Sequence, residues 1–237
     1  MEKRWGLNID VEGFSALYEY SEDGKTKAIF ALRDLMQAII SIGRLTYPGD
    51  PTNNESDRIF AHQFGDGFIL VSNFEEIDAT RCVSIGIALM RHMTMKGHAT
   101  KVAISTGGMS DIKGCYPKVV CDADGDTISL GAGLMTTIPV MGTALTKAHK
   151  LGTRVSGNVL VVDITQFGTY PEDVLLKVNN NIAFIDWKSD KFELPRTISE
   201  KAGLEYGDTK LLYSKYQEYI SSKPTPPDSW IEASEIS

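Results

Sequence analysis

The chain has 237 residues, with 24 Lys and Arg against 31 Asp and Glu, and a formal charge of −7 at pH 7. Hydrophobic residues make up 42% and charged residues 23%, which is globular usage and excludes a fibrous or disordered chain. No apolar run approaches the ~18 residues of a membrane span, and an acidic chain is a poor match for a broad nucleic-acid-binding face. The N-terminus MEKRWGLNIDVEG turns acidic before any apolar run, unlike a signal peptide. We therefore expect a cytoplasmic protein that binds neither a membrane nor nucleic acid.

The first half of the chain alternates between predicted strands and helices. Residues 5–10 form a short strand that ends on an acid, and residues 11–27 carry turn residues. Apolar residues at helical spacing predict an amphipathic helix over 26–45. The runs RIFAHQF and FILVSNF flank Gly-Asp-Gly and predict a β-hairpin. A second helical pattern over 77–97 leads into a strand at 101–106.

The second half is less regular. Turn residues dominate 107–141, where a hairpin is expected to fold at Asp124-Gly125. The remaining predicted elements are a helix at 143–151, strands at 158–164, 173–178 and 182–187, a surface helix at 208–222 and a mobile tail at 223–237. The leading order β-α-β-β-α-β is that of a ferredoxin-like core with an antiparallel sheet. We expect an α+β fold, with one catalytic domain over 1–200 and a C-terminal extension over 201–237.

Two aspartates stand out by their positions. Asp10 ends the first strand and Asp66 lies at the tip of the predicted hairpin, which can lie beside that strand. Two close carboxylates repel each other unless protons or cations lie between them. Mg²⁺ or Mn²⁺ prefers such oxygen ligands, and a metal pair ~3.5–4 Å apart is the usual device for phosphoryl transfer. The alternative is structural: Asp66 is a turn residue and Asp10 caps a strand.

Five ordered segments resemble class III nucleotidyl cyclases. Residues 8–15, NIDVEGFS, are similar to the D-[IV]-x-G-F-[ST] motif, and residues 64–68, FGDGF, to the family's Gly-Asp hairpin. The segments KVAISTG at 101–107 and GTALTKAHKL at 142–151 resemble the strand ending in a His-Thr-Gly-like turn and the G-x-x-[VL]-N-x-A-x-R-[LM] helix. Residues 157–162 would be the strand after it. The resemblance covers roughly residues 5–165.

The resemblance implies a two-metal active site shared between two copies of the chain. Asp10 and Asp66 would bind two divalent ions, Mn²⁺ or Mg²⁺, with the Val11 carbonyl as a further ligand. The ribose 3′-hydroxyl of a nucleoside triphosphate would attack the α-phosphate, and pyrophosphate would leave. The family's site forms across a head-to-tail homodimer.

The same resemblance assigns the phosphate contacts. The backbone of Gly13, Phe14 and Ser15 would cradle the β- and γ-phosphates, where the chain turns toward a helix. Lys177 occupies a place similar to the family's phosphate-binding lysine.

The chain departs from the family at the positions that stabilise the transition state. Thr146 and Lys150 stand where the family has Asn and Arg; they lie four apart and therefore on one helix face. Thr donates a hydrogen bond, and Lys supplies charge without the guanidinium fork. A rival alignment from Asp122 places Ser129 and Gly133 there instead, and both residues of the first pair also fit an ordinary solvated face.

The chain also departs from the family at the positions that contact the nucleotide base. His62 replaces the hairpin lysine of adenylate cyclases, although alternation along the strand also fits a packed histidine, and Pro139 replaces the partner acid. This combination resembles the stand-alone pyrimidine cyclases of Pycsar anti-phage systems, which implies a uridylate or cytidylate cyclase with UTP favoured. The alternatives are a purine cyclase, a catalytically silent nucleotide-binding regulator, and a diguanylate cyclase relative that FGDGF disfavours because it lacks the Glu of GGDEF.

Overall fold

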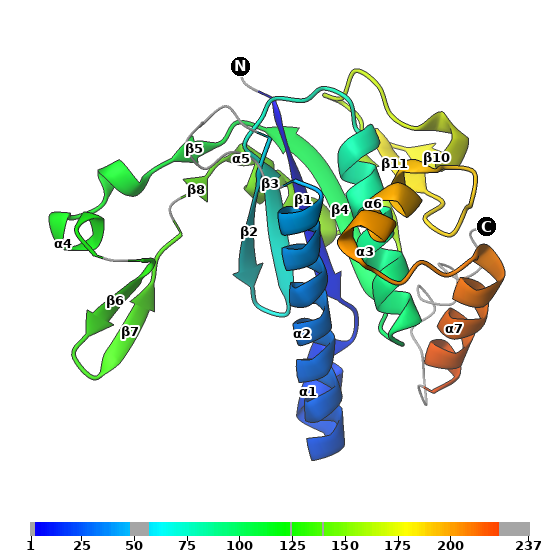
Figure 1. Cartoon of the computed structure of the whole chain (residues 1–237), viewed down its shortest axis with the longest axis horizontal. Coiled ribbons are helices and arrows are strands. Elements are labelled where there is room, and N and C mark those ends of the chain that lie inside the picture. The colour runs from blue at the N-terminus through cyan, green and yellow to red at the C-terminus, as the bar shows by residue number, and fades with distance from the viewer. Residues whose placement is uncertain (1–2, 48–56, 124, 139, 223–237) are drawn as a thin grey trace.

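The computed structural model describes residues 3–47, 57–123, 125–138 and 140–222. The expected tail at 223–237, Asp124 and Pro139 lie outside the described residues. The described chain is a mixed α+β fold built on one seven-stranded sheet (Figure 1). No helix in these ranges is long and apolar enough to cross a membrane.

The sheet has the strand order β10-β11-β9-β4-β1-β3-β2. Its strands are β1 (Arg4–Val11), β2 (Ile59–Phe64), β3 (Gly67–Ser72), β4 (Thr100–Gly107), β9 (Leu160–Asp163), β10 (Leu175–Asn179) and β11 (Ile182–Ile185). β1 pairs antiparallel with both β3 and β4, and β2 with β3, as expected. The whole sheet is mixed rather than antiparallel, because β9 runs parallel to β4, while β11 pairs antiparallel with both β9 and β10. A helical crossover between β4 and β9 makes this parallel pairing possible.

Helices cover both faces of β1. On one face α2 (Glu22–Leu45) and α3 (Thr80–Met95) pack on alternate β1 side chains such as Trp5 and Ile9, which are fully buried. On the other face lies α5 (Thr143–Gly152). A Cβ at Gly6 would lie 2.4 Å from the Ala144 carbonyl oxygen, so this strand position needs glycine for the helix to approach. Asp10 lies on the α5 face of the strand.

The predicted helices are confirmed. The prediction that residues 11–27 form turns is wrong, because most of them are helical. Residues Phe14–Tyr20 form a short helix, α1, that follows Gly13 in the left-handed conformation (φ 74°). Ser21 then starts α2 four residues earlier than expected, because its side chain accepts a hydrogen bond from the Gly24 backbone N–H.

An arm of irregular structure extends away from the sheet between β4 and α5 (Figure 1). The short strands β5 (Ser110–Asp111) and β8 (Val140–Met141) pair at its base, followed outward by α4 (Lys118–Cys121) and the hairpin of β6 (Thr127–Leu130) and β7 (Gly133–Thr136). This hairpin folds around Gly131 (φ 76°) and not at the expected Asp124-Gly125. Its side chains are largely exposed, including Leu130 and Leu134.

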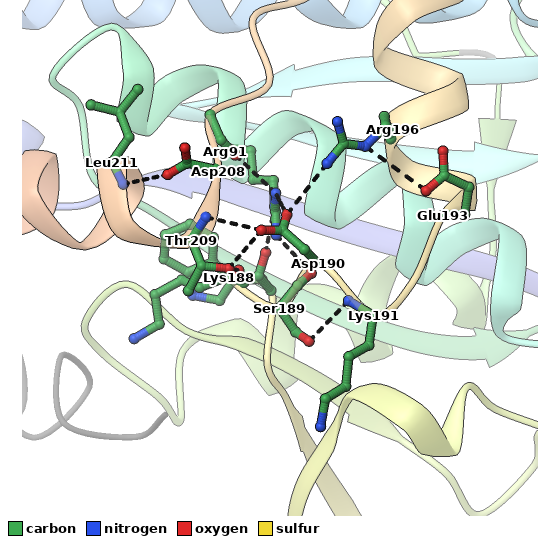
Figure 2. A network of polar contacts seen from close by, with 12 residues as sticks. Arg91, Lys188, Ser189, Asp190, Lys191, Glu193, Arg196, Asp208, Thr209 and Leu211 are labelled. Carbon is green, nitrogen blue, oxygen red and sulfur yellow. Dashed lines mark hydrogen bonds and ion pairs between the residues drawn. The ribbon is translucent and has the colours of Figure 1, made fainter.

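The C-terminal elements pack on α3. The β10–β11 hairpin turns at Asn180 and Asn181, which adopt positive φ, a conformation that asparagine tolerates better than most residues. α6 (Leu194–Ala202) and α7 (Thr209–Ser221) then contact α3, and the expected domain boundary at residue 200 falls inside α6. Arg91 of α3 lies at the centre of the polar network that joins these segments (Figure 2).

Candidate active site around Asp10 and Asp66

The two predicted metal-binding acids lie side by side. In the β1–β3 ladder Asp10 pairs with Gly67, so Asp66 at the hairpin turn lies next to it. The Val11 backbone N–H donates to the Asp66 carbonyl at 3.4 Å and joins the two segments. A Cβ at Gly67 would lie 2.9 Å from Oδ1 of Asp10, so the absence of a side chain there leaves room for the carboxylate.

The electrostatics of the pair favour a positive charge between the acids. Burial, the charge of Asp66 and a hydrogen bond between the two side chains raise the pKa of Asp10 from 3.8 to about 6, against the opposing effect of Lys101. A divalent cation would offset this repulsion, and two carboxylates fit the oxygen preference of Mg²⁺ or Mn²⁺. The described residues contain no cluster of three or more His, Cys, Asp or Glu side chains at metal-binding distance. The further ligand expected from the sequence, the Val11 carbonyl oxygen, belongs to the residue that directly follows Asp10 on β1.

Sequence reasoning missed two charged side chains beside the pair. Nζ of Lys101 lies 3.5 Å from Oδ2 of Asp10 and 2.9 Å from Oε1 of Glu12. Lys101 is the β4 residue directly opposite Asp10 in the β1–β4 ladder, so strand register could have identified it. Glu12 is 7% exposed and gave no comparable signal, because its partners come from segments far away in the sequence.

A small cavity of about 180 Å³ opens beside the acids. Asn8, a buried β1 residue on the same face as Asp10, lines it together with Lys101 and the α5 residue His149. Sequence reasoning missed Asn8 too, although strand alternation places it on the same face as Asp10. The cavity therefore combines the charged groups of Asp10, Asp66 and Lys101 with apolar lining such as Phe64.

The phosphate-cradle residues follow directly after the acid strand. Gly13 begins α1, while the Phe14 ring packs toward the main core and stacks on Tyr18 at 5.7 Å. Ser15 is exposed. Gly13, Phe14 and Ser15 follow Asp10 closely in the chain, with the spacing of the motif. No other feature of the described residues assigns them a ligand.

Three further predicted site residues line a second, larger cavity. It measures about 780 Å³ and lies between the sheet, α5 and the arm. His62, Thr146 and Lys150 line it, and neither Asp10 nor Asp66 does. Most of its lining is apolar, with side chains that include Phe64, Ile69, Val120, Met135, Ile138, Met141 and Leu145. Phe64 and His149 line both cavities, so the two groups of predicted residues border one another.

His62 has the environment of a ligand-facing group. Burial lowers its pKa, against a smaller opposing effect of Asp126 on the arm. Among the described residues, buried Nε2 of His62 has no hydrogen-bond partner. Buried polar atoms are normally paired, so a ligand or water in the large cavity is the natural partner.

Lys177 lies far from the acids within one chain. Its strand β10 is at the edge of the sheet, and β11, β9 and β4 separate it from β1. At ~4.8 Å between strands, four positions amount to about 19 Å. The Lys177 ammonium lies 4.7 Å from the centre of the Phe184 ring. A phosphate role for Lys177 at these acids would require a second copy of the chain.

The raised pKa of Asp10 makes a prediction about stability. The folded state binds an extra proton between the ordinary carboxyl pKa and about 6, so this contribution to stability is lost as pH rises through 6. Asp10→Asn should therefore stabilise the metal-free protein at pH 7.5 by about 1–3 kcal/mol, and by less at pH 5.

Urea denaturation in a chelating buffer at both pH values tests this expectation. Glu19→Gln, an exposed acid on α1, is the matched control and should change nothing. Equal effects of Asp10→Asn at both pH values would contradict the repulsion between the acids.

No protein-family model matches the chain, and no curated protein is significantly similar to it. The proposal below therefore depends on the geometry of the two acids and on the motif resemblance.

Proposed function

We propose that the protein is a metal-dependent nucleotidyl cyclase that converts a pyrimidine nucleoside triphosphate, UTP first, to its 3′,5′-cyclic monophosphate and pyrophosphate. The observation that carries the proposal is the contact between Asp10 and Asp66, with the pKa of Asp10 raised to about 6. The strand order β4-β1-β3-β2 is compatible with a ferredoxin-like, cyclase-type core. The resemblance to Pycsar cyclases extends the proposal to an anti-phage second messenger.

The reaction forms a bond from the ribose 3′-oxygen to the α-phosphorus and breaks the bond from that phosphorus to the oxygen bridging the α- and β-phosphates. The 3′-hydroxyl proton passes to solvent. Two bound Mg²⁺ or Mn²⁺ ions would supply activation of the hydroxyl and neutralisation of phosphate charge. In this proposal Asp10, Asp66 and the Val11 carbonyl hold the ions, and the backbone from Gly13 to Ser15 orients the phosphates.

Three of the remaining residues act from the second cavity. Thr146 and Lys150 would stabilise charge on the α-phosphate, and His62 would contact the base. Lys177 would approach the terminal phosphates. Because four strand positions separate Lys177 from the acid strand, the proposal requires a head-to-tail homodimer with composite sites.

Exposed apolar side chains support such a dimer. Leu130, Leu134, Ile138 and Met141 lie along the arm and its base, and each is at least 38% exposed. Large exposed apolar patches mark interaction sites more often than free surface. An arm that extends from the body can cover a second copy without rearranging the sheet.

A second candidate is a silent nucleotide-binding regulator with the same fold. The Thr146 hydroxyl is 3.5 Å from the Gly142 carbonyl and 3.4 Å from the Thr143 carbonyl of its own helix, so the helix already engages this donor. Lys150 also lacks the two-pronged geometry of arginine. This candidate predicts triphosphate binding without turnover.

A product assay separates the candidates. Purified protein should be incubated with UTP, CTP, ATP or GTP and Mn²⁺, and the products separated by liquid chromatography and mass spectrometry. We expect cyclic UMP or cyclic CMP together with pyrophosphate. Cyclic AMP or cyclic GMP alone would favour a purine cyclase, and no cyclic product from any triphosphate would overturn the enzymatic proposal.

A further inference from the structure

The C-terminal helix α7 contacts the turn that follows the acid strand β1. The Tyr219 hydroxyl donates to the Glu12 carbonyl at 3.0 Å, although 207 residues separate the two in sequence. Tyr216 and Ile220 of the same helix are buried against Ala99, which directly precedes β4. The rings of Tyr216 and Tyr219 stack at 6.4 Å. The helix is therefore fixed in place where its hydroxyl meets the turn.

Glu12 is held from several directions. Its backbone N–H donates to the Ala99 carbonyl at 3.0 Å, and its Oε2 accepts from the Gly157 N–H at 3.1 Å. Its Oε1 lies 2.9 Å from Nζ of Lys101. With the bond from Tyr219, both backbone groups and both carboxylate oxygens of this buried residue are engaged.

The Lys101 ammonium is shared unequally between two acids. It lies 2.9 Å from Glu12 and 3.5 Å from Asp10. An ammonium drawn fully to Asp10 would occupy the carboxylate that a divalent cation needs. Glu12 is the nearer partner of the ammonium and competes with Asp10 for it.

We propose that Glu12 and Tyr219 are positioning residues for the acid pair. Glu12 retains Lys101 away from Asp10, and Tyr219 fixes the turn that carries Glu12. The C-terminal extension is thus part of the active site rather than an appendage. This inference rests on the proposed function, because it assigns the acid pair to a divalent cation.

Two variants test the proposal on the full-length chain. Tyr219→Phe keeps the stacked ring and removes the hydroxyl, and Glu12→Gln keeps the shape and releases Lys101. Isothermal titration calorimetry with Mn²⁺ alone should show affinity about five- to tenfold weaker in each variant, the size expected from one lost hydrogen bond or from renewed competition by the lysine. Tyr213→Phe, on the exposed side of the same helix, should match the wild type.

The metal dependence of the kinetics is a readout that a merely structural role would leave unchanged, and hydrogen exchange locates the effect in the turn. In Tyr219→Phe the backbone amides of residues 11–13 should exchange about five- to tenfold faster, while amides in α3 keep wild-type rates. With UTP and Mn²⁺ the variant should show a raised metal requirement and a nearly unchanged kcat at saturating Mn²⁺.

The outcomes separate the inference from the proposed function. Wild-type Mn²⁺ affinity and exchange in Tyr219→Phe, or wild-type affinity in Glu12→Gln, would overturn the inference. Mn²⁺ binding that the two variants weaken, with no cyclic product from the wild type, would support the inference and overturn only the enzymatic proposal. A wild-type protein that binds no Mn²⁺ would overturn both.

Discussion

Asp66→Asn should lower formation of the cyclic product by about 10³-fold or more, because losing one carboxylate removes several kcal/mol of metal-dependent transition-state stabilisation. The fold should survive, since Asp66 is half-buried at a hairpin turn and asparagine is equally suited to that turn. Removing one charge of the repelling pair should leave stability unchanged or slightly raised. The measurement is the initial rate with UTP and Mn²⁺, with circular dichroism as the check on folding.

Glu75→Gln is the matched control for this variant. Glu75 is an exposed acid just beyond the opposite end of β3, away from the Asp10 pair, and its variant should turn over like the wild type. Asp66→Asn should also weaken Mn²⁺ binding in calorimetry. A folded Asp66→Asn protein with wild-type turnover would refute the assignment of Asp66 to a metal.

Arg91→Met should destabilise the protein by about 3–5 kcal/mol, the usual effect of removing one partner from a buried charged network. Arg91 is fully buried, and its guanidinium donates to the carbonyls of Trp187, Ser189 and Gly207 and to Asp190 (Figure 2 shows the network around Asp190). It also lies 4.1 Å from the Tyr206 ring. The substitution leaves the buried carbonyl oxygens of Trp187 and Gly207 without their donor.

Arg196→Met is the matched control. Arg196 also approaches Asp190, at 3.7 Å, and lies 5.1 Å from the Tyr206 ring, but its side chain is 41% exposed. Exposed ion pairs contribute little, so we expect a loss below about 1 kcal/mol. Both free energies of unfolding come from urea titrations.

Arg91→Lys covers the case in which Arg91→Met fails to fold. Lysine keeps the charge but cannot reproduce the forked set of donors, so its stability should lie between those of Arg91→Met and the wild type. Stability within 1 kcal/mol of the wild type in either Arg91 variant would contradict the assigned role of the network.

The candidate site was predictable where local sequence determines geometry. A strand ending on Asp10 and a hairpin with Asp66 at its tip follow from alternation and from Gly-Asp-Gly, and the structure places the two acids together as expected. Lys101 was readable in principle, because strand register places it opposite Asp10. The role of Glu12 was not readable, because its contacts come from β4, Gly157 and α7.

The sequence by itself determined the alternation of strands and helices, the hairpin at Asp66 and the acid pair, because each depends on periodicity or turn chemistry within a few residues. Only the tertiary structure decided that β9 joins the sheet in parallel, that the arm leaves the body, and that His62, Thr146 and Lys150 line an adjoining cavity. It also decided that α7 reaches the acid strand. These features depend on contacts between segments far apart in the chain, and no local pattern specifies such contacts.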